Sequence, residues 1–179
     1  MLILNQTVMI KAYIICHIST HVVEIKAAIE INAPVDKVWE VVSDLDNDAK
    51  FWTATTSIRN FSSENNEVKR EVMLAKINKC LQTITLYPKG KIHTEWTKGI
   101  IKGTKDIILN PRNNTTYLEA VLDYKFTGMA GFMSGKITRD VQIETQRAVE
   151  FIKEKAEGVN KSLKMEDRTH WADMYDEKK

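Results

Sequence analysis

The sequence has few cysteines, no long apolar run and almost no excess charge of either sign. Cys16 and Cys80 lie far apart and form neither a CxxC pair nor a zinc-ligand pattern, so we expect reduced thiols and a cytoplasmic location. Lys and Arg number 26 against 24 Asp and Glu, and this balance argues against a dedicated nucleic-acid binder. No apolar run approaches the length of about 20 residues that crosses a bilayer, so we expect no integral membrane segment.

Motifs for catalysis and cofactor binding are also missing. No Ser-His-Asp, Cys-His or HExxH pattern can be assembled, and the sequence has no GxGxxG motif and no P-loop. His93 stands next to Glu95 on a predicted strand, but a metal site needs three or four converging ligands. We therefore expect no metal and no cofactor, and we assign no catalytic residue.

A chain of 179 residues is long enough for one domain with a substantial core. We expect an N-terminal extension at 1–21, which lacks the basic start of a secretory signal, and one folded domain at 22–158. Residues 159–179 read as a charged, solvated tail. The alternative for the tail is a short helix that docks on the domain through Trp171, Met174 and Tyr175.

Residues 25–52, IKAAIEINAPVDKVWEVVSDLDNDAKFW, carry the strongest structural signal. Isoleucines and alanines alternate with Lys26 and Glu30 in the two-residue period of a half-buried strand. Pro34 suits the first position of a helix, and Asp36 favours the positive end of that helix. An acidic break then precedes an aromatic pair, so we expect a strand followed by two short helices.

After this segment the sequence changes to short alternating runs separated by turn residues. These runs predict strands near 57–63, 68–77, 80–87, 92–98, 104–109 and 116–126, and the short connections favour antiparallel pairing. A long amphipathic helix follows up to about Glu157, with an apolar stripe of Met133, Ile137, Val141, Ala148, Phe151 and Ile152. Gly158 is a natural helix stop.

The wording INAPVDKVWEVVSDLDNDAKFW, with the strands and the long helix behind it, resembles the SRPBCC (START-like) superfamily over residues 22–158. This superfamily includes polyketide cyclases, lipid-transfer START domains and the birch-pollen allergen. The resemblance implies an α+β helix-grip fold, in which a curved antiparallel sheet of six to seven strands wraps around the long C-terminal helix. It also implies that function depends on an internal cavity.

Glu144 is the main anomaly, because it falls within the apolar stripe of the long helix. A carboxylate there faces a wet cavity, pairs with a cation or stays protonated, unless the sheet leaves this turn uncovered. We expect it to anchor a polar end of a ligand. Arg70 shares strand parity with Val68 and Val72, so it either faces inward and pairs with an acid such as Glu144, or lies in water at the sheet rim.

Aromatic residues supply the other candidates for a pocket, although each of them is also an ordinary core residue. Trp96 and Tyr124 lie on apolar strand faces, while Phe51 and Trp52 follow the first helix near the expected cavity mouth. The loop at 128–135 is the other expected part of that mouth. The candidate ligand-binding set is Phe51, Trp52, Arg70, Trp96, Tyr124, Met133, Ile137 and Glu144.

The sequence is compatible with three functions. The one we favour is binding of a small hydrophobic or lipid-like molecule in the cavity, for carriage or sequestration and without catalysis. The second is a cyclase or dehydratase like those of the polyketide branch, with water or one acid as the proton carrier. The third is an interaction module similar to the co-chaperone relatives, with a collapsed cavity and an exposed patch for a protein partner.

Overall fold

The computed structural model describes residues 23–127 and 134–159, and the side chains of 134–137 lie outside this description. The predicted extension at 1–21 and the tail beyond residue 159 also lie outside it. Within the described chain no helix is long and apolar enough to cross a membrane. In chain order the elements are β1 (Val23–Ile31), α1 (Val35–Val42), the 3-10 helix η1 (Leu45–Lys50), β2 (Thr55–Glu64), β3 (Glu67–Leu74), β4 (Asn78–Tyr87), β5 (Lys91–Lys98), β6 (Ile101–Arg112), β7 (Thr115–Phe126) and α2 (Ser134–Ala156).

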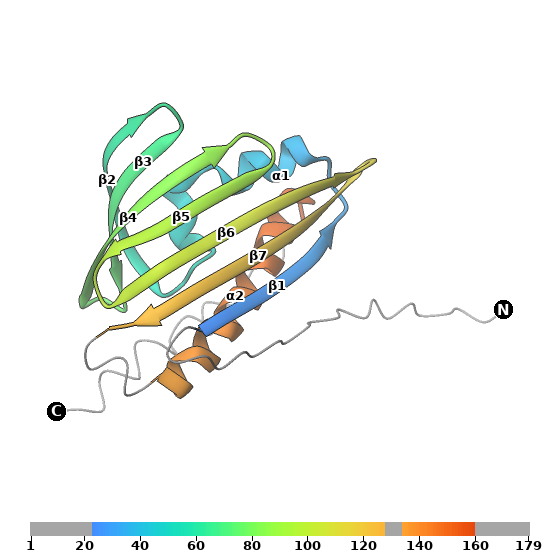
Figure 1. Ribbon diagram of the computed structural model, residues 1–179. Helices are drawn as coiled ribbons and strands as arrows, with labels where there is room; N and C mark the ends of the chain where they lie inside the picture. Colours follow the sequence, from blue (N-terminus) through green and yellow to red (C-terminus); the bar gives the residue numbers. More distant parts are fainter. Residues whose placement is uncertain (1–22, 128–133, 160–179) are drawn as a thin grey trace.

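The strands form one antiparallel sheet of seven members in the order β1-β7-β6-β5-β4-β3-β2. β1 thus returns to pair with β7, while the other strands follow one another as hairpins. Figure 1 shows the sheet curving, with α2 lying against its inner face behind β1 and β7 and with α1 near one end. This arrangement is the predicted helix-grip fold, and α1 with η1 supplies the two predicted short helices.

The two-residue period of the strands determines which side chains face α2. In β7 the burial alternates along the whole strand, so that Leu118, Ala120 and Leu122 face inward and the residues between them face outward. β3 alternates in the same way, which places Arg70 on the same inner face as Val68 and Val72. The inner face of the sheet is therefore mainly apolar, and Arg70 is a charged residue on it.

α2 closes this inner face through Thr145, Ala148, Val149 and Ile152, which are all buried. Its C-terminal end is tied to β1, since Lys153 Nζ donates to the Glu30 carbonyl at 2.6 Å and the Asn32 N–H donates to Glu157 Oε1 at 2.7 Å. Phe151, predicted in the buried stripe, is only half-buried and lines an outer groove instead. The buried side of the helix is rotated toward Val149, because the helix packs mainly on β1 at the edge of the sheet.

β6 extends further than the sequence predicts. The sequence predicts a strand near 104–109, yet pairing with β7 continues to Arg112, opposite Thr115. The pairing of β5 with β6 reaches only Ile108, so Pro111 lies where β6 has no neighbour on its other side. A proline at such a position does not remove a hydrogen bond from the sheet.

Gly103 in β6 lies between two aromatic residues, with Trp96 opposite it on β5 and Tyr124 opposite it on β7. Its φ is +130°, and a Cβ at this position would collide with the carbonyl oxygen of Asp123. The two rings meet edge to face with centroids 5.9 Å apart. The missing Cβ therefore allows β6 to approach β7 closely at the point where these two rings meet.

We predict that Gly103→Ala lowers the free energy of unfolding by about 3 kcal/mol or more, since both the backbone angle and the carbonyl of Asp123 oppose a Cβ. Urea unfolding measures the difference. Gly90→Ala is the matched control, because its Cβ would meet its nearest atom at an ordinary 3.6 Å. A loss no larger in the Gly103 variant than in the Gly90 variant would contradict this account.

Candidate functional site

Five polar side chains gather on the concave side of the sheet, where the surrounding residues are apolar. We call them the inner polar cluster: Asp48 of η1, Arg70 of β3, Gln82 of β4, Lys105 of β6 and Glu144 of α2. Arg70, Gln82, Lys105 and Glu144 are buried, and the side chain of Asp48 is 15% exposed. Ionisable groups are rarely buried without a partner, so the contacts of each one indicate its role.

Arg70 is 2% exposed, and each of its three side-chain nitrogens has a partner. Its Nη2 lies 2.5 Å from Asp48 Oδ2, its Nε donates to Gln82 Oε1 at 2.6 Å and its Nη1 donates to the Leu45 carbonyl at 3.2 Å. The inward orientation predicted from strand parity is correct. The predicted partner, Glu144, is wrong, because η1 brings Asp48 to the guanidinium, and the alternative of a solvated rim position is also wrong.

Asp48 stays ionised despite its surroundings. Burial alone would raise its pKa, but the charges of Lys105 and Arg70, together with hydrogen bonds from Arg70 and Trp52, hold the pKa of Asp48 below its usual range. Asp48 and Arg70 therefore form a compensated ion pair that ties η1 to β3.

Glu144 is 8% exposed, so the turn of α2 that carries it is covered. The alternative prediction, that the sheet leaves this turn uncovered, is therefore wrong. Its Oε1 accepts the Ala54 N–H at 2.6 Å. Burial raises the pKa of Glu144 to about 7, although the Ala54 N–H, Lys105 and Thr53 oppose this shift. A carboxyl group with this pKa can hold or release a proton near neutral pH.

Asp48, Gln82 and Lys105 are the members of the cluster that the sequence did not predict, and Lys105 is the one that makes no hydrogen bond to a described residue. It is 6% exposed, and its Nζ lies 3.9 Å from the centre of the Trp52 ring and 3.8 Å from Asp48 Oδ2. Burial lowers the pKa of Lys105 to about 8, with Asp48 acting in the opposite direction. The available signal was strand parity, because Lys105 alternates in phase with the buried Ile107 and Leu109.

The remaining predicted residues are divided between the interior and the undescribed part. Trp52, Trp96 and Tyr124 are buried on the inner side, and burial raises the pKa of the Tyr124 hydroxyl. The Trp96 Nε1–H finds no acceptor among the described residues. Met133 and the side chain of Ile137 lie outside the description.

One space adjoins this cluster, and a second lies outside it. An inner void of about 10 Å³, enough for about one water molecule, is lined by Asp48, Lys105 and Phe51, with Val42, Leu45, Trp52, Ile84, Ile92, Thr94, Ile107 and Ile152 around them. A much larger outer groove of about 790 Å³ lies between α1 with η1 on one side and the C-terminal half of α2 on the other. Phe51 lines both spaces, so it stands between them.

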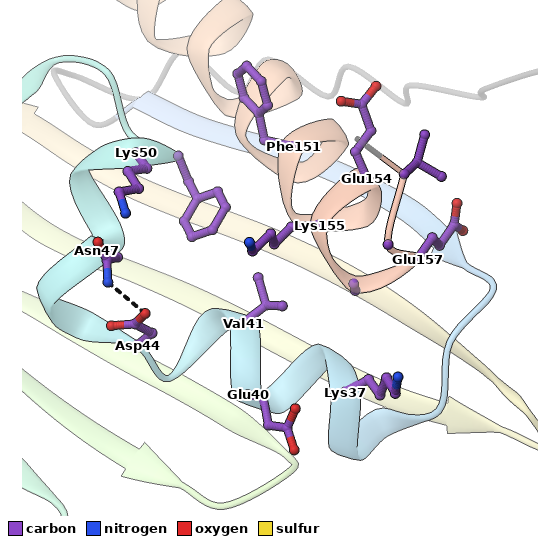
Figure 2. Close-up of a pocket in the computed structure, with 14 residues that line it drawn as sticks. Lys37, Glu40, Val41, Asp44, Asn47, Lys50, Phe151, Glu154, Lys155 and Glu157 are labelled. Carbon is purple, nitrogen blue, oxygen red and sulfur yellow. Dashed lines mark hydrogen bonds between the residues drawn. The ribbon is translucent and has the colours of Figure 1, made fainter. Parts of the chain in front are cut away.

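Figure 2 shows the outer groove, with Glu40, Asn47 and Lys50 on one wall and Lys155 reaching across from α2. Its charged residues carry both signs and several are exposed, so they favour no single ligand charge. Its apolar part consists of Val41, Phe51, Phe151, Ala156 and Val159. The described residues contain no group of three side chains that could hold a metal ion.

A sequence-family model described as polyketide cyclase / dehydrase and lipid transport matches residues 22–157. A search of curated proteins gives no match. Among solved structures, TTHA0849 from Thermus thermophilus is 14% identical, with a TM-score of 0.65 over 76% of this chain and 99% of that one. The Zhui aromatase/cyclase from Streptomyces sp. R1128 is 17% identical, with a TM-score of 0.55 over 78% and 91%.

Two further structures share the fold. The di-domain aromatase/cyclase StfQ from the steffimycin biosynthetic pathway is 13% identical, with a TM-score of 0.64. The match covers 77% of this chain and 51% of that one. A START superfamily protein from Mycobacterium smegmatis is 15% identical, with a TM-score of 0.52 over 72% and 98%. At these identities the comparison concerns the fold.

We predict that Glu144→Gln stabilises the protein in a pH-dependent way. As the pH rises from about 4.5, the unfolded carboxyl group loses its proton while the folded one keeps it until about pH 7, so the wild type loses stability over this window. Glutamine keeps an acceptor for the Ala54 N–H and does not titrate. The advantage of the variant should therefore grow by about 3 kcal/mol between pH 4.5 and pH 7.

Urea unfolding at several pH values measures this difference. Glu40→Gln, at an exposed position of α1, is the control and should show no such growth. A Glu144→Gln advantage that stays constant from pH 4.5 to pH 8 would show that the carboxyl group is ionised without cost in the folded protein.

Proposed function

The chain belongs to the polyketide cyclase / dehydrase and lipid transport family, and from this premise we propose that it carries or sequesters a small, largely apolar molecule between the sheet and α2. Family membership and fold confirm the SRPBCC resemblance. They support ligand binding as the general activity, and the choice of a carrier follows from the residues of the interior. The cytoplasmic location expected from the sequence stays part of this proposal.

The observation that carries the proposal is the arrangement of Lys105 and Glu144. These two ionisable groups enter the interior from opposite walls, the sheet and α2, and form no ion pair with each other. A core selected only for stability would contain apolar residues here, or a close pair with all hydrogen bonds satisfied. Buried polar groups held apart in an apolar surrounding are typical of a ligand site.

The two spaces supply a route for the ligand. The inner void has room for about one water molecule. A ligand can therefore enter the void only if the residues that line it move apart. The outer groove has the volume of an ordinary small-molecule site, and it is separated from the void by Phe51. Rotation of Phe51 would join the two spaces into one cavity, with the apolar wall contributing about 25 cal/mol per Å² of buried ligand surface.

We expect the wild type to bind the neutral apolar dye N-phenyl-1-naphthylamine, with a rise in dye fluorescence, and Phe51→Ala to speed the association by about tenfold, because the smaller side chain no longer separates groove and void. Stopped-flow fluorescence measures the rate. Phe61→Ala on β2, where the ring is 53% exposed, is the control and should leave the rate unchanged.

The wild type failing to bind the dye at micromolar concentrations would count against an apolar-ligand carrier. Binding with equal association rates in the Phe51 and Phe61 variants would retain the carrier and remove Phe51 as its gate.

A second candidate function is cyclisation or dehydration of a polyketide-like substrate. The observation that favours it is Glu144, whose pKa of about 7 suits a general acid or base at neutral pH. Such an enzyme would fold the reactive chain against the inner face while Glu144 moves one proton. This reaction needs no covalent bond between the protein and the substrate.

For this alternative we expect turnover of a poly-β-ketone thioester with a bell-shaped dependence on pH, and a loss of kcat by about 100-fold in Glu144→Gln. Product analysis by chromatography provides the measurement. An uncatalysed product distribution that the protein leaves unchanged would exclude the cyclase and keep the carrier.

A further inference from the structure

We propose that the Lys105 ammonium binds a carboxylate at the inner end of the ligand, so that the ligand class is a hydrophobic carboxylic acid. This inference rests on the proposed function and adds the chemical identity of the ligand's polar end.

The hydrogen bonds of Lys105 are incomplete. An ammonium group has three N–H donors, and among the residues that the structure describes none accepts a hydrogen bond from this one. Asp48 Oδ2 is 3.8 Å away, and the same oxygen is already bound by Arg70 at 2.5 Å. The Trp52 ring covers a further side of Nζ, and the inner void adjoins it. A ligand oxygen in this void would supply the missing acceptor.

The local charges favour an anion over a neutral group. The charged and titratable groups that act on Lys105 are Asp48 from η1, Arg70 from β3 and Glu144 from α2. Asp48 and Arg70 compensate each other, and Glu144 is neutral for part of the time at pH 7. The interior then keeps the positive charge of Lys105, and a carboxylate would balance this charge with a charge-assisted hydrogen bond.

The shape of the site determines the direction of the ligand. Apart from Lys105, Asp48 and Thr94, the side chains that line the void are apolar, and one of them, Phe51, also belongs to the apolar part of the outer groove. A ligand with its carboxylate at Lys105 would therefore direct its hydrocarbon part past Phe51 into the groove. An amphiphile with one acidic end and an unbranched apolar body fits this path.

The test compares octanoate with 1-octanol by isothermal titration calorimetry, on the wild type, on Lys105→Met and on Lys102→Met. Lys102 is an exposed lysine of the same strand that lines neither space, and it serves as the matched control. We expect Lys105→Met to weaken octanoate binding by at least about tenfold while 1-octanol binding changes by less than about threefold. Lys102→Met should leave octanoate binding within about threefold.

The outcomes separate the two levels of the proposal. Equal octanoate affinity in the wild type and Lys105→Met, or binding of 1-octanol but not octanoate by the wild type, overturns the carboxylate site and leaves an apolar-ligand carrier standing. Failure of the wild type to bind either molecule overturns the carrier and the carboxylate site together.

A second measurement uses only the wild type, so it does not depend on the folding of a variant. Octanoate binding requires the protonated form of Lys105 and is favoured by the neutral form of Glu144, and both forms are lost as the pH rises from about 7 to 9. Octanoate affinity should therefore fall by roughly tenfold or more over this range. An affinity for octanoate that follows that for 1-octanol, with no fall, contradicts the proposal.

Discussion

The ion pair between Asp48 and Arg70 fastens η1 to the concave face of the sheet. η1 is a single short 3-10 helix without a fully buried residue, so apolar burial alone gives it little hold on the domain. Arg70 reaches it from β3, while Gln82 and the Leu45 carbonyl each accept a further hydrogen bond from the guanidinium. A buried ion pair needs such additional hydrogen bonds to offset the cost of removing its charges from water.

The chain that follows η1 takes its position from this attachment. Trp52 places its ring over Lys105, and the Ala54 N–H donates to Glu144 on the opposite wall. The same short segment therefore shields one ionisable group and holds the other. Burial moves the two pKa values toward each other, to about 8 for Lys105 and about 7 for Glu144, so both groups can change their charge close to neutral pH.

The similar solved structures share this fold at 13–17% sequence identity. A fold of this kind provides a curved wall, a long helix and a space between them, and the chemistry is decided by the few polar residues that face this space. Among the described residues of this chain they are one ion pair with Gln82 beside it, one carboxyl group, and one ammonium to which no described residue offers a hydrogen-bond acceptor. The proposed ligand follows from this combination and from the position of Phe51.

Much of the fold could be predicted because strands and helices leave local signals. Alternating isoleucines marked β1, Pro34 marked the start of α1, and the apolar stripe placed the buried Glu144 on α2. Parity also turned Arg70 inward, but Asp48 read as part of a polar break, and Lys105 went unnoticed on a short predicted strand. The sequence by itself determined the elements, their order and the buried faces, since periodicity is a property of neighbouring residues. Only the tertiary structure decided that Asp48 meets Arg70 and that Lys105 has no hydrogen-bond acceptor within the part of the chain that the structure describes, because these distances depend on how the sheet curves and where η1 lies on it.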